Sequence, residues 1–127
     1  MTELELVWLA GLLEGEGSFH VGRNYSGRGW YVQVRVNMID KDVIAKAAAL
    51  MQCSCLLRYE PSMRRRGYKP QYKATLHAQR AIDLMYKLLP HMGDRRSARI
   101  KEIIRVWEDR YNHKPAREYN TLEELGL

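Results

Sequence analysis

Long apolar runs and a basic amino-terminal segment are both missing from this chain of 127 residues. The apolar run over residues 6–13 is far too short for a membrane-spanning helix. The chain starts with Glu3 and Glu5 instead of the basic segment of a secretory signal. We therefore expect an intracellular protein, cytoplasmic, organellar or phage-encoded, that is neither secreted nor membrane-bound.

Cysteine is also scarce, since Cys53 and Cys55 are the only two. A tetrahedral zinc site would need further ligands at compatible spacing, and the four histidines at positions 20, 77, 91 and 113 do not supply them. A disulfide framework is equally unexpected in an intracellular protein. We expect both cysteines to be buried, reduced thiols two residues apart on one strand.

Acidic residues are scarce in one part of the chain. Residues 1–60 carry six Lys or Arg against seven acids, residues 61–117 carry fifteen against five, and residues 118–127 carry none against three. Arginines outnumber lysines two to one, and a guanidinium group binds phosphate through two hydrogen bonds. This asymmetry indicates a nucleic-acid partner, with a generically basic soluble protein as the alternative.

The apolar periodicity predicts one α+β domain over residues 1–113, followed by a polar tail over residues 114–127. The strand over residues 30–38 is the clearest, because apolar residues from Trp30 to Met38 alternate with polar ones. Alternation of this kind is typical of an antiparallel sheet that is covered by helices on one face only. The remaining expected elements are helices over residues 2–15 (with Thr2 as the N-cap), 43–51, 78–89 and 94–111, and strands over 18–25, 53–59 and 71–76.

The first predicted helix runs directly into Glu14-Gly15-Glu16-Gly17 and a strand. Carbonyl groups at the end of a helix lack intrahelical partners, so a carboxylate among them favours a divalent cation. From Leu9 to Gly17 the chain resembles, without a gap, the signature of the LAGLIDADG homing endonucleases. The resemblance implies an αββαββα fold with an open four-stranded sheet, helices on one face and a concave DNA-binding surface on the other.

The resemblance also implies a metal-dependent DNA endonuclease that uses Mg²⁺ or another divalent cation. Glu16 and the backbone carbonyl of Gly15 would bind the ion, while Glu14 supports the helix end. Because the chain has a single motif, a homodimer is implied, with its first helices crossing side by side. Trp8, Ala10, Gly11 and Gly15 are the expected interface residues. The alternative is that the two glycines only make room for a strand of the same chain.

Two further catalytic positions of the family are matched less directly here. Met38 occupies the place where the family often has a Gln or Asn that orients the water, and Met cannot do this. Asn37, its neighbour, is the expected substitute. Arg95 and Arg96 lie nearest to the place of a charge-stabilising Lys, although arginine cannot readily act as a base. A solvated basic first turn is the alternative for this pair.

The outward side chains of the expected strands form a candidate DNA-reading set, because Arg can recognise guanine and Gln or Asn adenine in the major groove. The connection before the last strand is expected to bind phosphate, or else to be a solvated hairpin tip. The alternatives for the whole protein are a non-cleaving DNA- or RNA-binding protein of the same fold, such as a maturase or regulator, and an interaction module with an incidental basic surface. The candidate residues are His20, Arg23, Asn24, Arg28, Tyr31, Gln33, Arg35, Arg58, Gln71, Lys73 and Thr75 on or near the strands, and Arg64, Arg65, Arg66 and Lys69 in the connection.

Overall fold

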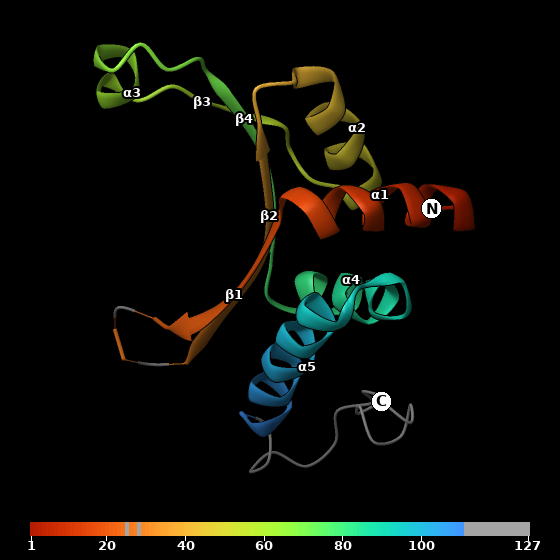
Figure 1. Cartoon of the computed structure of the whole chain (residues 1–127). Helices are drawn as coiled ribbons and strands as arrows, with labels where there is room; N and C mark the ends of the chain where they lie inside the picture. Colours follow the sequence, from red (N-terminus) through yellow and green to blue (C-terminus); the bar gives the residue numbers. More distant parts are fainter. Residues whose placement is uncertain (25, 28, 111–127) are drawn as a thin grey trace.

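A four-stranded antiparallel sheet with helices packed on one face forms the protein, as the sequence predicts (Figure 1). The computed structural model describes residues 1–24, 26–27 and 29–110. In Figure 1 the helices α1, α2, α4 and α5 lie to the right of the sheet, and both hairpin ends reach to the left. In chain order the elements are α1 (Glu3–Glu16), β1 (Gly17–Arg23), β2 (Trp30–Met38), α2 (Lys41–Met51), β3 (Leu56–Arg58), α3 (Pro61–Arg65), β4 (Gln71–His77), α4 (Ala78–Leu88), the 3-10 turn η1 (Leu89–His91) and α5 (Asp94–Asp109).

Helix α1 begins at the predicted cap. The Thr2 hydroxyl accepts a hydrogen bond from the Glu5 amide at 3.1 Å, and the Glu5 carboxylate accepts one from the Thr2 amide at 3.2 Å. At the other end, the chain changes from α1 to β1 without a loop. A Cβ on Gly17 would lie 2.6 Å from the Leu13 carbonyl oxygen, so only glycine allows this close approach.

The sheet order is β1-β2-β4-β3, which leaves β1 and β3 at the two edges. Cα partners in adjacent strands share a face of the sheet. The face toward the helices carries Val32, Val34 and Val36, all at most 1% exposed, and these residues belong to the core. The opposite face, here called the polar face, has no helix over it in Figure 1. Its members on β1, β2 and β4 are Ser18, His20, Gly22, Tyr31, Gln33, Arg35, Asn37, Gln71, Lys73, Thr75 and His77.

The second hairpin differs most from the prediction. Strand β3 has three residues, so Cys53 and Cys55 lie in the loop before it and not on a strand; both are half-buried, free cysteines. The connection contains the short helix α3, because Pro61 suits a first helical turn and Met63, 8% exposed, buries its side chain. Apart from the 3-10 turn η1, which was not predicted, the other elements agree with the prediction, with shifts of one or two residues at some of their ends. The predicted tail over residues 114–127 and its boundary lie outside the described residues.

Candidate nucleic-acid interface and metal-binding carboxylate

The strand register sorts the predicted reading residues into rows across the polar face. One row joins Ser18, Arg35 and Thr75, and the next joins His20, Gln33 and His77. A third row runs from Asn37 through Lys73 to Leu56 on β3. The side chains of a row lie next to one another, so the polar face offers a continuous surface of hydrogen-bonding groups.

A groove of about 640 Å³ runs over β2 and β4 on this face. Four of its lining residues, Gln33, Arg35, Lys73 and Thr75, belong to the predicted reading set. The others come mainly from the loop after α2 and from the start of α4, which sequence reasoning did not include: Gln52, Cys53, Ser54, Leu56, His77 and Arg80. Nothing in their spacing marks them, because only the packing of α2 and α4 on the sheet brings them to its edge.

Arg80 fixes the loop that borders the groove. Its guanidinium group donates to the carbonyl oxygens of Met51, at 3.2 Å, and of Gln52. These carbonyls lie at the carboxyl end of α2, where Gln52 has a left-handed backbone with φ of 57°. A cation at a helix carboxyl end is favourable, so Arg80 stabilises both the helix end and the loop. Burial raises the pKa of the neighbouring Cys53 thiol, which favours its protonated, unreactive form.

Glu16 is exposed and is the last residue of α1. Gly17 and Val36 form the last pair between β1 and β2, and Glu16 and Asn37 each lie one residue beyond it. The expected metal ligand and the expected water-orienting residue therefore lie at the same end of the β1–β2 pair. Asn37 lies on the polar face, and its buried Oδ1 atom has no hydrogen-bond partner among the described residues. Met38 points to the opposite face and packs against the core.

One side of α1 has no partner within the described chain. A Cβ on Gly11 or Gly15 would meet no atom within 4 Å, and Leu4 and Val7 on this side are 82% and 47% exposed. We call these four residues the glycine stripe. Among the described residues no strand packs against these glycines, which contradicts the alternative that they make room for a strand of the same chain. Ala10 does not belong to the stripe, because it is 2% exposed and lies in the core.

Trp8 is half-buried against the core, with the Lys46 ammonium group 4.1 Å from its ring centroid. It therefore packs beneath α2 instead of pointing freely outward from α1. Of the predicted interface residues, only Gly11 and Gly15 lie on the exposed side of the helix.

Glu14 connects the end of α1 to the start of α5. Its carboxylate accepts a hydrogen bond from the Gly93 amide at 3.4 Å, and its backbone oxygen accepts one from Arg96 Nε at 3.2 Å. Gly93 is the N-cap of α5 and has no side chain to cap it. A carboxylate at a helix amino terminus interacts favourably with the exposed amides and the helix dipole. Glu14 therefore links the end of α1, which carries Glu16, to the start of α5.

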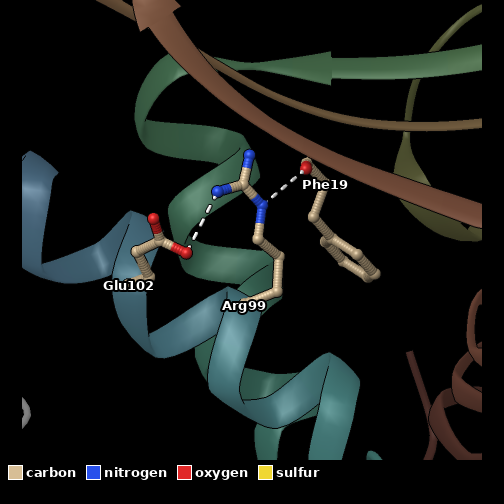
Figure 2. Close-up of polar contacts among 3 residues, drawn as sticks. All are labelled: Phe19, Arg99 and Glu102. Atoms are coloured by element: carbon tan, nitrogen blue, oxygen red, sulfur yellow. Dashed lines mark hydrogen bonds and ion pairs between the residues drawn. The ribbon is translucent and has the colours of Figure 1, made fainter.

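Three arginines of α5 surround the outer edge of β1. Figure 2 shows Arg99, whose Nε donates to the Phe19 carbonyl at 3.3 Å and whose Nη1 pairs with Glu102 at 3.1 Å. The Arg96 guanidinium lies 5.8 Å from the Phe19 ring centroid, while Arg95 is exposed. A pocket of about 350 Å³ lies between these arginines and β1, lined by Ser18, Phe19, His20, Arg95, Arg96 and Arg99.

His20 lies beside this cluster of cations. Burial lowers the pKa of His20 below its usual range, and the nearby Arg35 and Arg99 lower it further. Its Nε2 atom is buried and has no hydrogen-bond partner within the part of the chain that the structure describes. The site therefore combines strong positive charge with a neutral imidazole at physiological pH.

The ends of the two hairpins differ in character. In the first, Arg23 stacks on Trp30, its partner in the register, at 4.5 Å, on the side of the sheet opposite to the polar face. Arg23 is therefore not part of the polar face; Asn24 follows it as an exposed residue, and Arg28 lies outside the described residues. The Tyr31 ring lies over Gly22, where a Cβ would come within 2.6 Å of it.

The second hairpin end carries most of its charge on the surface. Arg64, Arg65, Arg66 and Lys69 are all exposed around α3, and the Arg64 guanidinium lies 5.1 Å from the Tyr59 ring centroid. Arg58 on the polar side of β3 forms an ion pair with Glu60 at 3.4 Å. In Figure 1, α3 lies far from the other helices, so its cations extend the polar face outward.

The described residues contain no group of three or more His, Cys, Asp or Glu side chains that could hold a metal ion. No helix within residues 1–24, 26–27 and 29–110 is both long and apolar enough to cross a membrane.

No protein-family model matches this sequence, and no curated protein matches it either. Solved structures do match in fold. The homing endonuclease I-CvuI, solved in complex with its target and 2 mM Ca, has a TM-score of 0.56 at 12% identity, over 97% of this chain and 95% of that one. The intron-encoded homing endonuclease I-CeuI, complexed with DNA, has a TM-score of 0.56 at 14% identity, over 98% of this chain and 75% of that one.

A third structure, the I-LtrWI LAGLIDADG homing endonuclease bound to target DNA, has a TM-score of 0.60 at 19% identity. The match covers 87% of this chain and 39% of I-LtrWI. At these identities the comparisons define the fold. The chain therefore has the fold of the LAGLIDADG homing endonucleases, the family that its motif from Leu9 to Gly17 resembles.

Proposed function

We propose that the protein is an intracellular, sequence-specific homing-type DNA endonuclease that depends on a divalent metal. Two copies join along the glycine stripe, and the dimer cuts both strands of a palindromic or nearly palindromic duplex. The observation that carries the proposal is the place of Glu16. This exposed carboxylate follows Gly15 of the glycine stripe directly and precedes by two residues Ser18, which lies on the polar face and lines the pocket of the α5 arginines.

The residues at the end of α1 fit a divalent cation such as Mg²⁺. Glu16 offers an exposed carboxylate, and Gly15 offers a carbonyl in the last turn of α1. Oxygen donors of this kind suit hard cations. Because the described residues contain no cluster of three or more His, Cys, Asp or Glu side chains, the second copy of Glu16 and the DNA phosphates would complete the ligand set. A bound divalent ion supplies Lewis-acid activation of the scissile phosphate and of a water molecule.

The other residues hold the reacting groups in place. The side-chain amide of Asn37, on the polar face at the end of the β1–β2 pair, hydrogen-bonds the attacking water and orients it toward the phosphorus. Arg95 stabilises the negative charge that develops on the phosphate, while Arg96 and Glu14 keep α5 and α1 at a fixed distance. The polar face lies along the major groove, and the cations around α3 bind phosphates at the outer part of each half-site.

The test begins with a random duplex library, from which the purified protein selects bound sites. Glu16→Gln keeps the shape of the side chain but weakens its oxygen ligation, so we expect the variant to bind a selected duplex and lose cleavage with Mg²⁺. Glu3→Gln, at the opposite end of the same helix, is the matched control and should cut normally. Cleavage by Glu16→Gln at the wild-type rate would refute the role of Glu16.

A non-cleaving DNA- or RNA-binding protein of the same fold is the second candidate, and Met38 favours it. Met38 packs against the core and offers no hydrogen-bonding group to a water at the family's usual position. This candidate predicts binding that does not require metal and no nicking of any selected site. Nicking by the wild type that disappears in Asn37→Leu, with binding retained, would instead support the nuclease.

A further inference from the structure

Leu56 is an apolar residue on the polar face. It forms a register pair with Lys73, which in turn pairs with Asn37, so the three residues make one row across β3, β4 and β2. Leu56 also lines the groove over this face. Its side chain is 51% exposed and does not take part in the hydrophobic core. Packing among the described residues therefore does not explain a leucine at this position.

The next residue provides the contrast. Leu57 pairs with Tyr72 on the opposite side of the sheet, is 62% exposed and is not among the groove-lining residues. Two leucines of similar exposure thus lie on opposite sides of the same edge strand. Only Leu56 adjoins the hydrogen-bonding and cationic groups that suit a nucleic acid, among them Lys73 and Arg35.

Base edges in the major groove differ in one apolar feature, the C5 methyl group of thymine. An exposed leucine beside an ammonium group is suited to contact such a methyl group and exclude water from it. The positive charge of Lys73, Arg35 and Arg80 around the groove complements the phosphates on either side of the base. This part of the groove therefore suits the edge of a base pair that carries a C5 methyl group.

We propose that Leu56 is a specificity-determining residue that contacts the C5 methyl group of a thymine in each half-site. The inference rests on the proposed binding of duplex DNA by the polar face. The inference specifies one base of the target duplex, since it requires a thymine at the position that Leu56 contacts. 5-Methylcytosine offers the same methyl group and is distinguished in the experiment.

The experiment measures the binding of a selected duplex in which each thymine is replaced, one at a time, by deoxyuridine. This change removes only the methyl group. For the wild type we expect one position in each half-site to lose about fourfold in affinity, the value for one buried methyl or methylene group. For Leu56→Ala, uracil and thymine at that position should bind equally well. Leu57→Ala should keep the full preference for thymine.

A second arm replaces the same pair with cytosine or 5-methylcytosine opposite guanine. If Leu56 contacts the methyl group, the wild type binds the duplex with 5-methylcytosine more tightly than the duplex with cytosine. If the wild type prefers thymine but binds these two duplexes equally well, Leu56 does not read the methyl group and the inference is overturned. Circular dichroism and thermal melting of Leu56→Ala and Leu57→Ala confirm that both variants fold.

The inference is overturned if the wild type and Leu56→Ala respond equally to every uracil substitution, or if the selected sites contain no preferred thymine. Both results leave the binding of duplex DNA intact. A wild-type protein that binds no duplex would instead refute the proposed function itself, and with it the inference. The selection step therefore separates the two failures.

Discussion

Adding a methyl group to Gly11 has opposite expected effects on the single chain and on the dimer. In the single chain, a Cβ at this position meets no atom within 4 Å, and the residue lies inside α1. Replacing glycine with alanine in a helix interior stabilises the helix by about 0.8–1.0 kcal/mol. Gly11→Ala should therefore raise the free energy of unfolding of the monomer by about that amount.

In the proposed dimer the two glycine stripes cross closely, so each new methyl group meets the partner helix. Overpacking of a close contact costs about 1–3 kcal/mol for each site, and the dimer contains two such sites. The dimer dissociation constant should therefore rise at least about thirtyfold, equivalent to about 2 kcal/mol. Since the two effects have opposite signs, helix propensity alone cannot produce both.

Sedimentation equilibrium over a dilution series measures the dissociation constant, and urea unfolding at concentrations where the protein is monomeric measures the stability. Ala45→Gly, at an exposed position of α2, is the matched control. It should lower the stability by a similar amount and leave the dimer unchanged. A dissociation constant for Gly11→Ala within a factor of about three of the wild type would refute the close crossing of the helices, because it corresponds to less than about 1 kcal/mol.

Three further predictions concern other parts of the molecule. Gly17→Ala should lower the urea midpoint, with a loss of about 1–3 kcal/mol, because its Cβ would lie 2.6 Å from the Leu13 carbonyl oxygen. The pKa of His20 in the folded protein is below its usual value, so the unfolded chain binds a proton more readily than the folded one. The stability measured by thermal melting should therefore fall as the pH drops through about 6.5, and it should fall less in His20→Gln. Replacing Arg64, Arg65 and Arg66 with Gln should flatten the slope of log affinity against log salt by about 2.7 if all three bind phosphate, and an unchanged slope would contradict this.

Much of the fold could be predicted because its local sequence patterns each favour one type of secondary structure. The N-cap at Thr2 and the alternation from Trp30 to Met38 both appear in the structure as the sequence predicts. Helix α3 was not predicted, since a five-residue helix has too little periodicity to stand out among arginines. Strand β3 is shorter than predicted because the apolar pattern of residues 53–59 does not reveal where pairing with β4 begins.

The candidate site could be predicted in part, residue by residue. The exposed Glu16, the polar rows of β2 and β4 and the open Gly11 and Gly15 are in the expected places. Ala10 and Trp8 were also predicted as interface residues, but Ala10 is buried in the core and the Trp8 ring contacts Lys46 of α2. One helical turn contributes residues to both the core and the surface, and sequence spacing alone does not separate the two groups. Arg80 and Leu56 were missed because their roles depend on contacts between distant segments.

The sequence by itself determined most of the elements, the two faces of the sheet and the acid at the end of the first helix. These follow from local periodicity and from the conformational freedom of glycine, which act over a few residues. Only the tertiary structure decided that Asn37 lies in one row with Lys73 and Leu56, and that Glu14 joins α1 to α5. It also decided that Leu56 lies among the cations. Strand register and helix packing arise from contacts between residues far apart in the chain, and no local pattern encodes them.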